Sequence, residues 1–167
     1  MESYDLLEQS IGQIAFVTPD LEKSIKAYTT TFKTNWTIYT YGPEILSTMR
    51  YHGKDSPFSI RIGLSYFGKT RIEFVQPLGG KTIHRDFLDK KGYGIQHLGI
   101  YVENMEKEIK KAEKAGIAII MEGAGFGLDG DGRFVYLDTL SEFGVTYELI
   151  ERPKQRRPPE ATIFTEG

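Results

Sequence analysis

The chain of 167 residues contains no cysteine, which excludes disulfides, thiolate metal sites and cysteine nucleophiles. No apolar run approaches the ~20 residues of a membrane-spanning helix. The formal net charge is only −2, so nothing indicates nucleic acid or an anionic membrane as a partner. The opening stretch, MESYDLLEQS, lacks the apolar segment of a signal peptide. We therefore expect a cytoplasmic protein.

Hydrophobic residues are not scarce: they make up 40% of the chain, and aromatic residues make up 13%. This supply is sufficient for a packed core and argues against wholesale disorder. The length fits one domain or two small fused modules.

The sequence repeats itself at an offset of 84 residues. IGQIAFVTPDLEKSIKAY, which begins at Ile11, aligns with IQHLGIYVENMEKEIKKA, which begins at Ile95. Each copy predicts a strand followed by an amphipathic helix. Asp20 and Asn104 are the expected N-caps, because their side-chain oxygens can accept from the free amides of a first helical turn, and Gly116 is the expected end of the second helix. The offset is too long for a solenoid unit and indicates a duplicated module.

Three strand-like segments follow the helix in each half. NWTIYTY, FSIRIGLSY and TRIEFVQP in the first half match IAIIMEG, RFVYLDT and VTYELIE in the second. KTIHRDFLDKKG predicts a connecting helix, in which His84 is expected to have a surface or helical role. We therefore expect an α+β fold of two βαβββ modules, at about residues 11–78 and 94–151. They form one domain over residues 1–153, and the proline-rich, charged residues 154–167 are expected to be a mobile tail.

Four polar side chains fall at two pairs of equivalent positions. Gln13 aligns with His97, and Glu73 corresponds to Glu148 on the last strand of the other module. Taken singly, such a histidine is more often a core side chain, and such a glutamate usually points to water. If the modules pack about a pseudo-twofold axis, however, all four side chains can converge. This donor set suits a divalent metal held mainly by oxygen, with one imidazole.

The sequence resembles the vicinal oxygen chelate superfamily, which includes glyoxalase I, methylmalonyl-CoA epimerase, extradiol dioxygenases and antibiotic-resistance proteins. The resemblance is carried by IAFVTPDLEKSIKAYTTTF, IEFVQPLGG, GIQHLGIYVENMEKEIKKAEKAG and RFVYLDTLSEFGVTYELIERP, from about Ile11 to about Pro153. It implies that the two modules form a half-open barrel around one metal ion. The ligands that it implies, carried over by position, are Gln13, Glu73, His97 and Glu148.

The resemblance also implies a chemistry. In such relatives the metal polarises a carbonyl and stabilises an enediolate or enolate while a proton leaves the neighbouring carbon. Glu148 is the first choice for the base and Glu73 the second. We expect one divalent ion, with zinc placed before nickel, cobalt or manganese, and a glyoxalase I-like isomerase, lyase or epimerase acting on a small carbonyl or thioester. The alternative is a non-catalytic, resistance-type binding protein. A homodimer is expected in either case.

Single positions separate the possible relatives. Glutamine, two glutamates and a histidine resemble the ligands of human-type glyoxalase I, whereas VQPLGGKTIHRDFLDKKGYGIQH looks more like the epimerase. The catalytic glutamate of the epimerase would fall at Arg61, and the glutathione-binding arginine of glyoxalase I would fall at Val17. The sequence therefore leaves open whether CoA or glutathione is involved.

Overall fold

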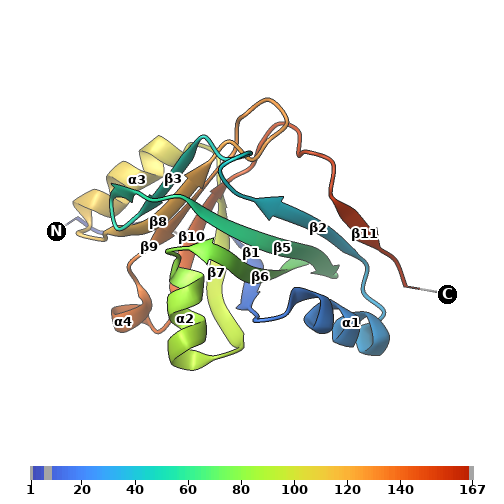
Figure 1. The fold of residues 1–167 in the computed structure, drawn as a ribbon. Coiled ribbons are helices and arrows are strands. Elements are labelled where there is room, and N and C mark those ends of the chain that lie inside the picture. The colour runs from blue at the N-terminus through green and yellow to red at the C-terminus, as the bar shows by residue number, and fades with distance from the viewer. Residues whose placement is uncertain (1, 6–8, 166–167) are drawn as a thin grey trace.

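One mixed sheet curls through the molecule into a half-barrel (Figure 1), in a computed structural model that describes residues 2–5 and 9–165. The spatial order of its strands is β11-β2-β5-β6-β1-β7-β10-β9-β8-β3-β4. The strands are β1 (Ile11–Val17), β2 (Trp36–Tyr41), β3 (Thr48–Tyr51), β4 (Lys54–Asp55), β5 (Phe58–Phe67), β6 (Thr70–Gly80), β7 (Gly94–Val102), β8 (Ile119–Ala124), β9 (Arg133–Leu137), β10 (Thr146–Glu151) and β11 (Ala161–Ile163). The helices of the described part are α1 (Leu21–Phe32), α2 (Ile83–Lys91), α3 (Met105–Lys114) and α4 (Leu140–Phe143). None of these helices is long and apolar enough to cross a membrane.

The strand order has the symmetry that the repeat predicts. β1 and β7, the first strands of the two modules, pair antiparallel at the centre of the sheet. On either side each pairs in parallel with the last strand of its own module, β6 or β10. The expected α+β fold of paired βαβββ modules in a half-barrel is therefore confirmed. The first half also carries a hairpin that the sequence did not indicate, β3–β4, and β3 pairs with β8 of the second module.

The first helix of each module begins at its expected cap. The Asp20 side chain accepts from the amide of Lys23, and the Asn104 side chain accepts from that of Lys107. Gly116 follows α3 with a φ of +74°, a value that suits glycine at a helix end. α1 and α3 bury separate apolar faces, which form two cores outside the half-barrel. The core under α1 contains Leu21, Ile25, Trp36, Ile38, Ile72 and Phe74, and the core under α3 contains Ile100, Val102, Met105, Ile109, Ala112, Val135, Leu137 and Leu149.

A third apolar cluster fills the inner side of the half-barrel and joins the two modules. Its buried members are Tyr39, Tyr41, Leu46, Phe58, Ile60, Ile62, Leu64, Val75, Ile83, Met121, Phe126, Phe134 and Tyr136. Because side chains alternate between the two faces of a strand, the residues beside each outward-facing core position point into this interior. On the strands at the centre of the sheet, some of the side chains that point into this interior are polar.

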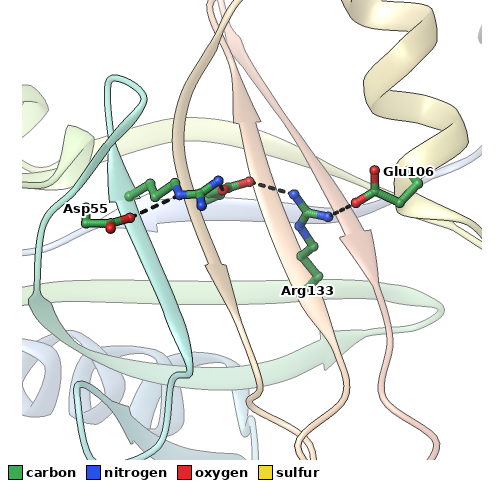
Figure 2. Close-up of polar contacts among 5 residues, drawn as sticks. Asp55, Glu106 and Arg133 are labelled. Atoms are coloured by element: carbon green, nitrogen blue, oxygen red, sulfur yellow. Dashed lines mark hydrogen bonds and ion pairs between the residues drawn. The ribbon is translucent and has the colours of Figure 1, made fainter.

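A chain of ion pairs fastens the β3–β4 hairpin to the second module (Figure 2). Glu122 on β8 lies between Arg50, at 3.2 Å, and Arg133, at 2.8 Å, and its side chain is only 6% exposed. Asp55 pairs with Arg50 at one end of the chain, and Glu106 on α3 pairs with Arg133 at the other. The buried carboxylate is thus neutralised from both sides, which a buried charge requires.

The prediction of a mobile tail over residues 154–167 is wrong for its described part. β11 adds to the edge of the sheet by pairing with β2. Arg156 donates to the hydroxyl of Tyr41 at 2.8 Å, and Glu160 accepts from Arg61 at 2.7 Å. Its prolines and charges exclude a core element, as expected, but they do not prevent an edge strand.

Candidate metal centre

Four adjacent strands at the centre of the sheet bring the four predicted ligands together. Glu73 lies on β6, Gln13 on β1, His97 on β7 and Glu148 on β10. All four residues are at most 7% exposed. One ligand atom from each of Glu73, His97 and Glu148 lies within 4.8 Å of the other two. The repeat predicted that these four side chains would converge, and in the structure they do.

The spacing of the polar atoms suits a shared cation. His97 Nε2 lies 3.1 Å from Glu148 Oε2 and 3.4 Å from Glu73 Oε1. Atoms each about 2.0–2.2 Å from one ion are separated by about 3 Å or slightly more, so these three ligand atoms have the spacing of a coordination shell. Gln13 Nε2, which is a donor and not a ligand atom, lies 3.0 Å and 3.4 Å from the same two oxygens. His97 Nε2 is buried and makes no hydrogen bond of good geometry, as expected of a nitrogen that serves a metal.

Two small residues make this convergence possible. Ala15 pairs with Glu73 on one side and with His97 on the other. Gly99, its equivalent in the second module, lies between Gln13 and Glu148. A Cβ on Gly99 would lie 2.8 Å from the Cβ of Gln13, well inside van der Waals contact. The signal was present in the sequence as a small residue two positions after each first-strand ligand, but it has meaning only once the strand register is known.

A buried amide holds His97 in one tautomer. Gln96 donates from Nε2 to the carbonyl of Ile83 at 2.9 Å, which fixes its oxygen toward two histidines. His97 Nδ1 lies 3.0 Å from that oxygen, and His84 Nδ1 lies 2.7 Å from it. Since the oxygen can only accept, both Nδ1 atoms carry hydrogen, and His97 Nε2 is left to bind a cation. Of the two roles expected for His84, the helical one is confirmed, since His84 lies on α2, and the surface one is wrong, because the side chain is fully buried.

The charges of the cluster favour a cation. Burial lowers the pKa of His97, but the charge of Glu148 and the contacts with both carboxylates outweigh burial and raise this pKa to about 9. Burial raises the pKa of Glu148, although the positive charge of His97 opposes the effect. Burial and then the charges of Glu148 and Glu73 raise the pKa of Tyr136 well above its usual value, so the phenol stays protonated. Without a metal, the proton on His97 supplies the compensating positive charge.

Arg71 is a second buried cation at this site, and nothing in the sequence pattern marked it. It lies on β6 opposite Gln13 of β1, and its Nε donates to Gln13 Oε1 at 2.7 Å. Its guanidinium also packs against the ring of Tyr101, 5.1 Å from the centroid. Arg61, which the sequence register placed at the position of the epimerase base, is not part of the site. It points away and pairs with Glu22 and Glu160.

Comparison with known proteins supports this architecture. The family model described as Glyoxalase/Bleomycin resistance protein/Dioxygenase superfamily matches residues 12–136. Methylmalonyl-CoA epimerase from Mycobacterium tuberculosis is 23% identical, with a TM-score of 0.61 over 92% of this chain and 95% of that chain. A hypothetical protein from Bacillus halodurans is 22% identical, with a TM-score of 0.60 over 89% of this chain and 98% of that chain.

An epimerase variant from Streptomyces coelicolor in complex with 2-nitronate-propionyl-CoA is 16% identical, with a TM-score of 0.60 over 89% of this chain and 98% of that chain. No curated protein matches by sequence. At these identities the solved structures show a shared fold and not a shared reaction. The family match, however, spans most of both modules and all but one of the four clustered residues. The chain therefore belongs to the Glyoxalase/Bleomycin resistance protein/Dioxygenase superfamily, that is, to the vicinal oxygen chelate proteins.

Proposed function

We propose that the protein is a metal-dependent isomerase, lyase or epimerase that moves a proton next to a carbonyl of a small substrate. The observation that carries this proposal is the buried Glu73, His97 and Glu148 cluster, whose ligand atoms lie within 4.8 Å of one another. Two carboxylates and one imidazole suit zinc, nickel, cobalt or manganese, and zinc remains our first choice. The fold, which is similar to that of methylmalonyl-CoA epimerase, is compatible with this reaction class.

Glu73, His97 and Glu148 are proposed to hold the ion, and Gln13 is the fourth candidate ligand. When bound, a divalent ion supplies Lewis acidity that polarises a carbonyl and makes the neighbouring C–H more acidic. Gln96 keeps the tautomer of His97 that has Nε2 free for this role. The likeness to glyoxalase I and to the epimerase leaves open whether the substrate is a carbonyl adduct or a thioester.

Glu148 is proposed as the base. Burial raises its pKa, and a base whose pKa lies closer to neutrality accepts a proton from carbon more readily. Tyr136 lies opposite Glu148 in the strand register, and its protonated phenol can donate to the carboxylate or to a substrate oxygen. Glu73 is the second choice, because its carboxylate occupies the equivalent place in the first module.

The proposal is tested first by metal content and then by proton exchange. Purified protein reloaded with zinc, nickel, cobalt or manganese should bind one ion per chain, and His97→Ala should lower that occupancy together with any activity. Candidate substrates, namely 2-oxoaldehyde–thiol adducts and 2-substituted acyl-CoA thioesters, are incubated with the loaded protein in D2O. Incorporation of deuterium at the carbon beside the carbonyl supports the proposal. Absence of a stoichiometric metal would refute it.

Glu148→Gln tests whether Glu148 acts as a base or only binds the metal. It keeps an oxygen donor of nearly the same shape, so metal and fold should be retained. Turnover should fall by roughly 10²–10⁴-fold, the usual contribution of a positioned base. If Glu73→Gln is the more damaging at equal metal content, the roles are reversed. Tight binding of a ligand without any exchange would favour the alternative, a binding protein of the resistance type.

We also propose a homodimer. Several large apolar side chains near the ends of α1 and β5 and the start of β7 are exposed, among them Phe32, Phe67, Tyr93 and Ile95, which are 42–58% exposed. Phe32 and Phe67 contact each other, with ring centroids 5.8 Å apart. Grouped apolar exposure of this kind is more typical of an interface than of a free surface. Sedimentation at micromolar concentration tests the proposal, and a stable monomer contradicts it.

A further inference from the structure

The orientation of the Gln13 amide is set by Arg71. A guanidinium nitrogen can only donate, so the Gln13 atom 2.7 Å from Arg71 Nε has to be the oxygen. The NH2 group of Gln13 consequently faces the carboxylates, with Nε2 3.0 Å from Glu148 Oε2 and 3.4 Å from Glu73 Oε1. Rotating the amide would place two donors against each other at Arg71 and would remove both contacts to the carboxylates.

Arg71 and a divalent ion would both have to bind the carbonyl oxygen of Gln13. A glutamine binds a hard cation through its carbonyl oxygen, whereas its NH2 group presents hydrogens and repels the cation. In the observed arrangement the oxygen of Gln13 is already bound to Arg71. Gln13 can become a metal ligand only if Arg71 gives up this hydrogen bond.

The position of Arg71 is itself constrained. The residue is only 6% exposed, and its guanidinium packs on the ring of Tyr101. That ring lies directly over Gly12, where a Cβ would be 2.1 Å from a ring carbon. Arg152 packs against the same ring, 4.5 Å from its centroid. Arg71 is therefore held beside Gln13 by packing as well as by one hydrogen bond.

We propose that Arg71 is a positioning residue that withholds Gln13 from the metal, so that Glu73, His97 and Glu148 alone hold the ion. Three protein ligands leave coordination positions for water or substrate, as catalytic sites do. The inference rests on the proposed metal centre and corrects its fourth ligand. It also places a fixed positive charge next to the site, which offsets part of the charge of the two glutamates.

The test is a double-mutant cycle in which zinc affinity is measured, and it needs no assay of activity. Zinc dissociation constants are measured by competition with a chelator for wild type, Gln13→Met, Arg71→Met and the double variant. Gln13→Met alone should change the constant by less than about threefold. Arg71→Met should tighten binding, and adding Gln13→Met to it should then cost about tenfold or more, the lower end of what ligand-supporting groups contribute.

Loss of the arginine charge could tighten zinc binding by itself, and Arg152→Met is the matched control. It removes a charge from the same tyrosine ring without touching Gln13, so it should alter zinc affinity by less than about threefold. The visible spectrum of the Co2+ form gives a second readout, because it changes with coordination number. It should change between wild type and Arg71→Met, but not between wild type and Gln13→Met.

Two results overturn the inference. One is a tenfold or greater loss of zinc affinity in Gln13→Met with Arg71 intact, which decides the question even if Arg71→Met does not fold. The other is an equal effect of Gln13→Met in both backgrounds. Failure of wild type to bind zinc or cobalt at all refutes the metal centre itself, and this inference with it. The two failures are thus distinguishable.

Discussion

Gly99→Ala is expected to disturb both stability and the metal centre, since it adds a single methyl group where two site strands meet. The new Cβ would lie 2.8 Å from the Cβ of Gln13 and 2.9 Å from Cδ1 of Ile150. Favourable carbon contacts begin at about 3.5 Å, so both contacts are about 0.6 Å or more too short. The Cβ of Gln13 is fixed to its backbone and no rotamer relieves the clash. β1 and β7 must therefore move apart.

Overpacking of this kind costs about 1–3 kcal/mol, while replacing a strand glycine by alanine regains about 0.5–1 kcal/mol. We expect a net loss of roughly 1–2 kcal/mol, measured as a lower urea midpoint at unchanged slope. Zinc affinity should fall by about tenfold or more, because parting β1 from β7 moves Glu73, on the strand paired with β1, away from His97 and Glu148. Gly94→Ala on the same strand is the control, since a Cβ there meets nothing within 4 Å. Equal stability and equal zinc affinity of the two variants would refute the reasoning.

The remaining predictions concern charged residues. Glu122→Gln removes the buried negative charge between Arg50 and Arg133 and should lower the free energy of unfolding by about 1–3 kcal/mol in urea, more than any exposed pair contributes. An unchanged midpoint contradicts this. The pKa of His97, raised to about 9 in the metal-free protein, means that metal must displace a proton, so zinc affinity should rise about tenfold per pH unit from 7 to 9 and then level off. The same raised pKa makes the contribution of His97 to metal-free stability complete below about pH 6.5, and this contribution is lost as the pH rises through 9. Arg156→Met removes the bond to Tyr41 and should cost about 0.5–1.5 kcal/mol in thermal or urea unfolding, whereas a truly mobile tail would show no change.

Most of what the sequence could predict followed from its internal repeat. Equivalent positions in two copies showed which side chains converge, and cap residues such as Asp20 and Asn104 showed where the helices begin. Helices α1, α2 and α3 and most strands followed from apolar periodicity, because each buries one face. The short helix α4 was not predicted, and none of its residues is buried. The spacing of polar residues alone could not show which of them share a cavity, and the pseudo-twofold relation supplied that information.

The residues that the sequence did not reveal depend on register and on packing across the sheet. Arg71 precedes Glu73 by two positions on the same strand, and only its pairing opposite Gln13 gives it a role. Gln96 adjoins His97 in sequence, but its importance comes from the carbonyl of Ile83 on the connecting helix. The C-terminal segment was misjudged for a related reason. Its polar composition indicates only that its side chains are exposed, whereas its backbone pairs with a strand far away in sequence.

The two borders of the sheet restrict how copies of this protein can meet. At one border β4 has only two residues, Lys54 and Asp55, both charged and exposed. At the other β11 has three residues and follows a segment that contains two adjacent prolines. Short, charged and proline-flanked borders offer few free amides and carbonyls to a neighbouring chain, and natural sheets use such features against aggregation. Copies of the protein should therefore associate through side-chain surfaces, and loss of the last strand would uncover β2 as a template for uncontrolled polymerisation.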